Sequence, residues 1–143
     1  LILQIQRQEF GMEISAEQQP DLMQIQSFYQ TGNGDFWLAR MQRTVIGTIG
    51  LKDIGNGDVA LRKMFVAAQW RGKELGVARQ MLELLIETSK MRGVKRIYLG
   101  TTEHFLAAHQ FYEKNCFKLI SMQDLPTSFP LMIVDTRFYT LLL

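Results

Sequence analysis

The apolar residues of the chain recur at helical spacing in some stretches and as short runs in others, which predicts alternating helices and strands. Helical spacing predicts helices over residues 1–10, 20–29, 75–92 and 101–115. Strands are predicted over residues 35–41, 44–54, 59–66, 95–100, 117–122 and 134–142. Tight turns at 42–43 and 55–58 make hairpins of the first three strands. Strands 59–66 and 95–100 are expected to be parallel because a helix joins them. The pattern predicts an α+β protein with a mixed, mostly antiparallel central sheet flanked by helices.

A glycine-bearing basic turn separates strand 59–66 from the helix over 75–92. Gly72 and Gly76 allow a ligand to approach the backbone closely. Arg71 and Lys73 add positive charge, and the first turn of the helix presents free N–H groups at the positive end of its dipole. This arrangement suits a phosphate or pyrophosphate. An ordinary strand-to-helix turn with solvated cations is equally compatible with these residues, which match neither the P-loop nor the dinucleotide-fold motif.

Composition narrows the class of protein. The 143 residues suffice for one domain, 1–143, and the hydrophobic fraction of 47% and charged fraction of 21% are typical of a soluble globular protein. The net charge of +2 comes from dispersed residues, which argues against a nucleic-acid partner. No apolar run approaches the ~20 residues of a membrane span. The single cysteine, Cys116, excludes an internal disulfide, offers no metal cluster and suits a reducing, cytoplasmic compartment. Because the chain does not begin with methionine, we expect a segment such as a strand to precede it.

Two stretches together resemble the motifs of GNAT-superfamily N-acetyltransferases. In the family's acetyl-CoA motif, arginine or glutamine is followed three residues later by glycine and two residues after that by glycine or alanine. Residues 61–66 and the turn after them resemble this motif: Arg71 matches its first position and Gly76 its last, while Glu74 replaces the middle glycine. Residues 111–117 resemble the second hallmark, in which Tyr112 near a helix end precedes a Gly-Phe strand start.

Two positions in the second stretch depart from the family pattern. Cys116 replaces the glycine of the Gly-Phe pair, and Phe105 stands seven residues before Tyr112, where the family often has asparagine. The resemblance covers roughly residue 36 to the C-terminus. It implies a GNAT-like fold in which the parallel strands 59–66 and 95–100 splay apart, leaving main-chain groups free for pantetheine.

The resemblance also implies an activity. An acceptor amine of a small molecule would attack acetyl-CoA directly, without a metal, and Tyr112 would protonate the departing thiolate. A main-chain N–H of strand 59–66 would stabilise the oxyanion. The expected coenzyme-binding residues are the end of this strand, the turn after it and Phe105: Met64, Phe65, Val66, Arg71, Gly72, Lys73, Glu74, Leu75, Gly76, Val77 and Phe105.

A general base is not evident from the sequence. Ala60 occupies the position where some family members carry a carboxylate. Glu103 is a substitute, although a glutamate in the first turn of a helix is more often a partner of the helix dipole. His104 and His109 are expected to be surface or half-buried helix residues, and Cys116 a small core residue.

Arg62 is a candidate for binding the acceptor. By strict alternation Ala60, Arg62, Met64 and Val66 share one face of their strand, unless a β-bulge changes the parity. Arg62 would then bind the anionic group of an amine such as an amino acid. The alternative is a surface or structural ion-pair residue.

Other functions remain open at this point. The chain could be a regulatory module that binds coenzyme A without turnover, an acetyltransferase for protein N-termini or lysines, or a plain anion-binding or partner-binding domain. Neither a nucleic acid nor a membrane is expected as a partner. A homodimer is compatible with the apolar tail over residues 141–143.

Overall fold

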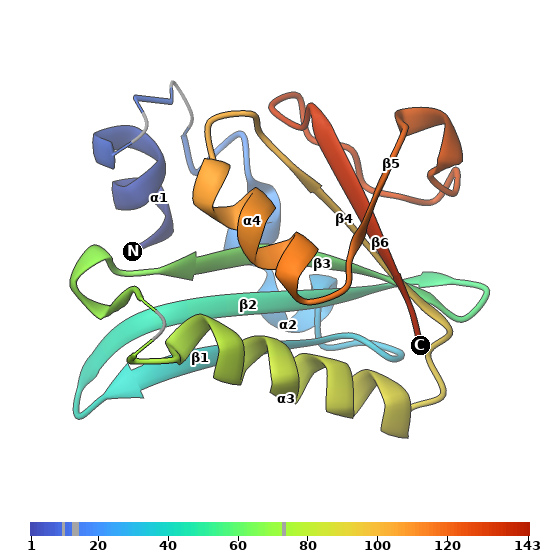
Figure 1. Cartoon of the computed structure of the whole chain (residues 1–143), viewed down its shortest axis with the longest axis horizontal. Coiled ribbons are helices and arrows are strands. Elements are labelled where there is room, and N and C mark those ends of the chain that lie inside the picture. Colours follow the sequence, from blue (N-terminus) through green and yellow to red (C-terminus); the bar gives the residue numbers. More distant parts are fainter. Residues whose placement is uncertain (10, 13–14, 73) are drawn as a thin grey trace.

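The computed structural model describes residues 1–9, 11–12, 15–72 and 74–143, and its centre is a six-stranded sheet of order β1-β2-β3-β4-β6-β5 (Figure 1). The strands are β1 (Asp35–Met41), β2 (Thr44–Gly55), β3 (Asp58–Val66), β4 (Arg96–Thr101), β5 (Lys118–Ile120) and β6 (Arg137–Leu142). Neighbouring strands are antiparallel except for the parallel pair β3–β4. The predicted α+β class and the predicted parallel pair are confirmed.

Helices lie on both sides of this sheet. Figure 1 shows α3 and α4 in front of it and α2 behind it. The helical segments are α1 (Ile2–Gln4), the π-helix η1 (Ile5–Glu9), the 3₁₀-helix η2 (Pro20–Met23), α2 (Ile25–Phe28), the 3₁₀-helix η3 (Ala68–Trp70), α3 (Val77–Met91), α4 (Leu106–Lys114) and the 3₁₀-helix η4 (Met122–Asp124). The single helix expected over 20–29 is two short ones, because Gln24 has φ −134°, outside the helical range.

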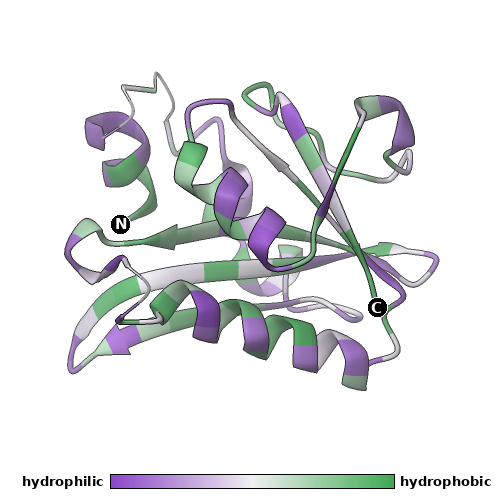
Figure 2. Ribbon diagram, viewed as in Figure 1, coloured by the Kyte–Doolittle hydropathy of each residue, from purple (hydrophilic) through white to green (hydrophobic). Residues whose placement is uncertain are grey.

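The two faces of the sheet bury separate apolar cores. The main core packs Val59 and Leu61 of β3 against Leu82 and Leu85 of α3. Figure 2 shows the alternating apolar and polar bands along α3 that this one-sided packing requires. Ala60, which points the other way, belongs to a smaller core with Tyr98, Phe129 and Phe138. The alternation of β3 therefore holds up to residue 61.

The C-terminal tail is largely internal. Leu141 and Leu143 pack against the main core, whereas Leu142 is 75% exposed. A subunit interface at the tail remains a prediction.

A β-bulge interrupts β3 at Lys63. Gly50 of β2 pairs with Arg62, whereas Thr48 pairs with Phe65, so β3 carries one residue more than its partner here. Lys63 has φ 53°, and its carbonyl accepts a hydrogen bond of 2.7 Å from Oγ1 of Thr48.

The predicted common face of Ala60, Arg62, Met64 and Val66 is therefore wrong. Ala60 packs in the smaller core, whereas Met64 and Val66 pack with the main core. One extra residue in a strand moves every later side chain to the opposite face.

Cys116 lies in the turn after α4 and is exposed, so its prediction as a core residue is wrong. It adopts the left-handed conformation, with φ 71°. Its N–H donates to the carbonyl of Glu113 at 3.3 Å, and the N–H of Phe117 donates to the carbonyl of Tyr112 at 3.0 Å. This pair of bonds is the Schellman motif, which ends helices and favours glycine at the position of Cys116.

We expect Cys116→Gly to raise the free energy of unfolding by up to about 1 kcal/mol, because glycine adopts this conformation without the clash of a Cβ. Urea denaturation at equilibrium measures the difference. Cys116→Ala is the matched control, since it removes the thiol but keeps the Cβ, and it should leave the stability near that of the wild type. A Cys116→Gly protein no more stable than Cys116→Ala would contradict this assignment.

Candidate active site

The parallel strands β3 and β4 pair over a short distance and then separate. Their ladder consists of Asp58↔Arg96, Val59↔Ile97 and Ala60↔Tyr98. The side chains of the first pair also form an ion pair, in which Arg96 Nε lies 2.9 Å from Asp58 Oδ1. Beyond Ala60, β3 pairs with β2 alone among the described strands, and β4 with β6 alone. The edge of β3 that faced β4 therefore carries main-chain groups outside any ladder of the described strands, as the resemblance implied.

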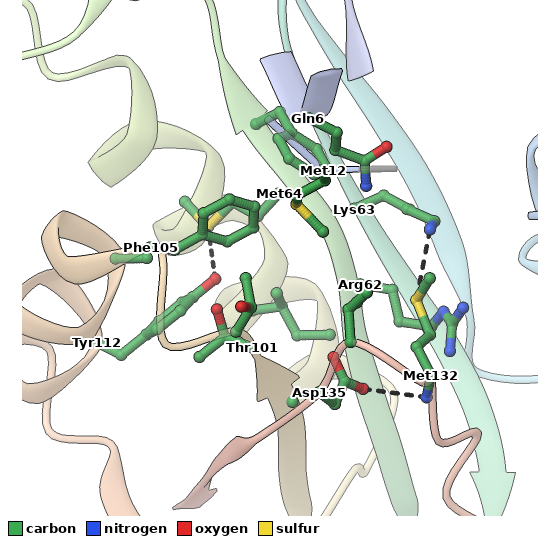
Figure 3. A pocket seen from close by; sticks show the side chains of 16 residues that line it. Gln6, Met12, Arg62, Lys63, Met64, Thr101, Phe105, Tyr112, Met132 and Asp135 are labelled. Carbon is green, nitrogen blue, oxygen red and sulfur yellow. Dashed lines mark hydrogen bonds between the residues drawn. The ribbon is translucent and has the colours of Figure 1, made fainter. Parts of the chain in front are cut away.

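A pocket of about 80 Å³ lies where the two strands diverge (Figure 3). It brings together five residues singled out in the sequence: Arg62, Met64 and Phe65 of β3, Phe105 before α4, and Tyr112 of α4. Its other described lining residues come from the N-terminal segment, β3, the end of β4, α4 and the loop before β6: Gln6, Met12, Leu61, Lys63, Gly100, Thr101, Thr102, Ala108, Met132, Val134 and Asp135.

Tyr112 presents a hydroxyl group to this pocket. Its ring packs against those of Phe117 and Tyr139, with centroid distances of 5.5 and 5.9 Å, and the residue is 6% exposed. The hydroxyl donates to the thioether Sδ of Met64 at 3.5 Å. Burial raises the pKa of Tyr112, so the group stays protonated at neutral pH. A thioether is a weak acceptor, which leaves this proton available to a stronger one.

The glycine-bearing turn lies further along, between β3 and α3. Gly72 and Gly76 have φ 115° and 65°, and a Cβ on Gly72 would meet none of the described residues beyond its chain neighbours within 4 Å. Gly76 is the N-cap of α3, and its left-handed conformation places the first helical residue at Val77, two residues later than predicted. Glu74 and Leu75 are exposed and precede the helix. Lys73 lies outside the described residues.

Arg71 fastens this turn to its surroundings. Its Nε donates to the carbonyl of Val66 at 2.7 Å, and its two terminal nitrogens bind both carboxylate oxygens of Glu9 at 2.6 and 3.0 Å. A bidentate pair of this kind has a defined orientation. The guanidinium therefore connects the turn to the end of β3 and to η1.

Glu103 does not lie where the sequence predicted it. Helix α4 begins at Leu106, so Glu103 occupies the preceding turn rather than the first turn of a helix. The N–H of Glu103 donates to Thr136 Oγ1 at 3.1 Å. Glu103 is exposed and is not among the residues that line the pocket. His109, expected at the surface or half buried, is buried with Nε2 2.9 Å from the carbonyl of Thr102.

Arg62 lines the pocket and is held by three neighbours. Its Nε donates to the hydroxyl of Tyr29 at 3.2 Å and its Nη1 to the carbonyl of Pro130 at 2.9 Å. Its Nη2 lies 3.7 Å from Asp21 Oδ2, and the Arg62 side chain is 10% exposed. Arg62 thus has a structural role, and it also faces the pocket.

At the bulge, the side chain of Lys63 approaches Asp21, the same carboxylate that Arg62 approaches. Its Nζ donates to Gln19 Oε1 and lies 3.6 Å from Met132 Sδ and 3.8 Å from Asp21 Oδ2. Burial lowers the pKa of Lys63 to about 8, with Asp21 opposing the change. An anion bound nearby would favour the charged form of this amine.

A second, larger pocket of about 550 Å³ adjoins the first. The two share Arg62, Met132 and Val134. The larger pocket is lined on its other sides by η2, α2 and the loop before β6, with Asp21 and Phe28 among its residues. Its volume is in the range of pockets that bind small molecules.

Asp135 is the site residue that the sequence did not reveal. The apolar run before it predicted a strand from residue 134, but β6 begins at Arg137 and the preceding loop brings Asp135 into the smaller pocket. Oδ2 of Asp135 accepts from the N–H of Met132 at 3.2 Å. Burial raises the pKa of Asp135, opposed by this hydrogen bond and by the positive charges of Arg62 and Lys63.

Comparison with known proteins places this fold and site in a family. Residues 2–116 match the model of the acetyltransferase (GNAT) family. The chain belongs to this family. It is a GNAT acyltransferase domain, as the motifs around Arg71 and Tyr112 indicated.

Solved GNAT structures superpose closely on the chain. A GNAT-family acetyltransferase of Staphylococcus aureus Mu50 has a TM-score of 0.93 and 41% identity, covering 97% of this chain and 86% of its own. An acetyltransferase of Streptococcus agalactiae has a TM-score of 0.94 and 31% identity, covering 100% and 87%. A GNAT acetyltransferase of Elizabethkingia anophelis, solved with acetyl-CoA bound, is 20% identical with a TM-score of 0.65, covers 93% of each chain and shares the fold.

Curated GNAT relatives carry more specific names. N-acetylaspartate synthetase of Danio rerio is 31% identical over 102 residues, which are 70% of this chain and 36% of that protein. Its counterpart in Xenopus tropicalis is 32% identical over 108 residues, or 73% and 38%. The chain thus spans little more than a third of these relatives. Within the described part of this GNAT chain, none of the helices has the length and apolar character needed to cross a membrane.

Proposed function

We propose that this GNAT domain binds acetyl-CoA and transfers the acetyl group to the primary amine of a small molecule that also carries a carboxylate. The observation that carries the proposal is the pocket between β3 and β4, in which the hydroxyl of Tyr112 faces an open strand edge. Such an edge accepts an extended ligand in the manner of an added strand.

The described residues fit acetyl-CoA at three places. The edge of β3 beyond Ala60 offers main-chain partners to pantetheine. Gly72 and Gly76 leave the backbone open at the N-terminus of α3, where N–H groups and the helix dipole attract a pyrophosphate. The small pocket accommodates the acetyl end beside Tyr112.

The chain's own groups would then assist the transfer. A main-chain N–H near Val66 polarises the thioester carbonyl, and Tyr112 donates its proton to the sulfur as the C–S bond breaks. The hydroxyl of Tyr112 now donates to the thioether Sδ of Met64 at 3.5 Å, and this contact with a sulfur atom supports the proposed role.

The acceptor class is supported by charge and by the relatives' names. Arg62 lines both the smaller pocket and the larger one, and its neighbour in β3, Lys63, lines the smaller pocket. Guanidinium and ammonium groups bind carboxylates. The named N-acetylaspartate synthetases are 27–32% identical to the chain over most of its length. We infer an amino-acid acceptor in the larger pocket, with its carboxylate toward Arg62.

A screen of amines for release of free thiol from acetyl-CoA tests the proposal. The panel includes L-aspartate, the other amino acids, their decarboxylated counterparts, polyamines and N-terminal peptides. Turnover of amino acids supports the proposal, and turnover of peptides alone would indicate a protein acetyltransferase. Tight coenzyme binding without turnover would indicate a regulatory module, and no coenzyme binding would indicate a different kind of anion-binding or partner-binding domain.

Arg62→Ala is expected to remove the preference for acceptors that carry a carboxylate. We expect wild-type kcat/KM to be higher for amino acids than for the matching decarboxylated amines, and the variant to lose roughly 10- to 100-fold on amino acids alone, the cost of one buried charged hydrogen bond. The measurement is kcat/KM for both classes with both proteins.

The matched control for Arg62→Ala is Arg96→Ala. Arg96 also pairs with a buried aspartate, Asp58, but it lines neither pocket. Its loss should lower stability without changing the preference. A wild type that favours decarboxylated amines, or an Arg62→Ala protein that is weakened equally on both classes, would leave Arg62 with a structural role alone.

A further inference from the structure

Asp135 contributes a carboxylate to the acetyl pocket from a part of the chain that the family match does not cover, since that match ends at residue 116. Among the described residues that line the pocket, it is the one that carries a carboxyl group. In Figure 3, Thr101 lies between Asp135 and Tyr112. The pocket thus has a carboxylate on one flank and the Tyr112 hydroxyl on another.

The fold holds this carboxylate at a fixed place. A Cβ on Gly100 would lie 2.7 Å from Oδ2 of Asp135 and 2.8 Å from its Cγ, so the glycine of β4 makes the room that the carboxylate occupies. The next residue, Thr136, donates its N–H to the carbonyl of Thr101 at 2.9 Å, and the N–H of Met132 donates to Oδ2. The position of Asp135 is therefore set by β4 and by its own loop.

The charges around Asp135 distinguish it from the other titratable groups of the pocket. Arg62 and Lys63 face it from β3, and the neutral phenol of Tyr112 lies on the α4 side. Figure 3 shows the Lys63 ammonium directed at Met132, away from Tyr112. The guanidinium of Arg62 offers hydrogen-bond donors and no acceptor, so it is not a candidate for the base. Among these groups, the carboxylate of Asp135 is the one that is both open to the pocket and able to accept a proton.

We propose that Asp135 is the general base of the acetyl transfer, receiving a proton from the ammonium group of the acceptor. This inference rests on the proposed function. The same arrangement matches a zwitterion, because the ammonium of an amino acid would face Asp135 while its carboxylate faces Arg62.

The protons and electrons of the step balance. The ammonium R–NH₃⁺ gives one proton to Asp135, and the nitrogen lone pair of R–NH₂ forms a bond to the thioester carbonyl carbon as the C=O electrons move to oxygen. When these electrons return, the C–S bond breaks and the sulfur takes the proton of Tyr112. The tyrosinate regains a proton from the nitrogen, which leaves the neutral amide. Asp135 releases its proton to water, so the net products are the amide, the thiol and one proton.

Burial makes the Asp135 carboxylate more basic than that of an exposed aspartate. Its pKa is raised by burial, and a base is more effective as its pKa approaches the working pH. Asp135 accepts a proton only when ionised, so the activity it supports is lost as the pH falls through its pKa. The positive charges of Arg62 and Lys63 oppose this rise in pKa and favour the ionised form of the carboxylate.

The test compares pH profiles of wild type and Asp135→Asn, with L-aspartate as the acceptor or the best amine of the panel in its place. At neutral pH we expect kcat/KM to fall roughly 10- to 100-fold, since water can replace a general base in part. The defect should shrink as the pH rises, because more of the amine is then already deprotonated, and the acidic limb attributable to Asp135 should disappear. Affinity for acetyl-CoA, measured by calorimetry, should be unchanged.

Three further variants make the test specific. Asp135→Glu keeps a carboxylate and should retain more activity than Asp135→Asn. Gly100→Ala should displace the carboxylate and reproduce the pH-dependent defect, so the proposal stays testable if Asp135→Asn does not fold. Asp124→Asn is the matched control, because Asp124 is exposed in η4 and lines neither pocket, and it should keep wild-type kinetics.

The outcomes separate the two proposals. A wild type that acetylates none of the amines overturns the proposed function and the inference with it. An active wild type with an equally active Asp135→Asn protein overturns the inference alone. A defect that is the same at every pH, or confined to KM, also overturns it, because a structural or purely binding role would give that result.

Discussion

Gly76→Val is expected to abolish the binding of acetyl-CoA. Gly76 has φ 65° and is the N-cap of α3, and among the described residues a Cβ there would approach the end of the Gln80 side chain alone, at 3.5 Å. The branched side chain would therefore project into open space in front of the helix N-terminus, where the pyrophosphate is proposed to bind. It would also disfavour the left-handed backbone that presents the N–H groups. Calorimetry with acetyl-CoA should show at least a 100-fold weaker affinity, a loss of about 2.7 kcal/mol or more.

Gly93→Val separates this effect from backbone strain. Gly93 follows the other end of α3, has φ 75°, and also leaves open space around a Cβ. Valine at residue 93 should lower the melting temperature about as much as valine at residue 76. It should leave the affinity for acetyl-CoA unchanged. Wild-type affinity in a folded Gly76→Val protein would show that the turn at Gly76 does not hold the pyrophosphate.

Tyr112→Phe is expected to lower kcat by about 10²-fold while the Kd for acetyl-CoA stays nearly the same, because a proton donor acts only as the thiolate leaves. The ring contacts with Phe117 and Tyr139 remain, and the loss is the hydroxyl and its hydrogen bond to Met64 Sδ. Steady-state kinetics and calorimetry on the same preparation measure the two quantities.

Tyr98→Phe is the matched control for this substitution. Tyr98 is also a buried tyrosine, but it packs in the smaller core and lines neither pocket. Its replacement should leave kcat unchanged. An unchanged kcat in Tyr112→Phe, under conditions where chemistry limits the rate, would make Tyr112 a core residue alone.

The elements with strong periodicity could be predicted from the sequence, and their exact geometry could not. The bounds of β1, and those of β2 and β3 to within one residue, follow from apolar runs and from the turn residues Asn56 and Gly57. The bulge at Lys63 has no such signal. It depends on a left-handed lysine and on a hydrogen bond from Thr48, a residue 15 positions away. A pattern of apolar and polar residues predicts which face of the sheet each side chain occupies only while no bulge interrupts the strand.

The same distinction applies to the site. Tyr112, Met64 and Phe105 could be selected because the resemblance to GNAT motifs assigns all three to the coenzyme site, and the structure brings them to one pocket. Asp135 could not, since its place depends on the space above Gly100 and on a loop whose apolar residues imitate a strand. Glu103 was a candidate for the general base, with a partner of the helix dipole as the alternative. Helix α4 begins only at Leu106, and Glu103 is not among the residues that line the pocket.

The short ladder between β3 and β4 has a mechanical consequence. The ladder of three residue pairs, with an ion pair at its first rung, joins a lobe of the sheet made of β1, β2 and β3 to a lobe made of β4, β5 and β6. An extended molecule that lies where β3 and β4 diverge, bonded to β3 and in contact with α4, would extend that ladder and contact both lobes at once. Bound acetyl-CoA would then hold the two lobes together in addition to supplying the acetyl group. The two lobes would open more readily in the free protein than in the complex, and departure of the product coenzyme would be coupled to their hinge motion.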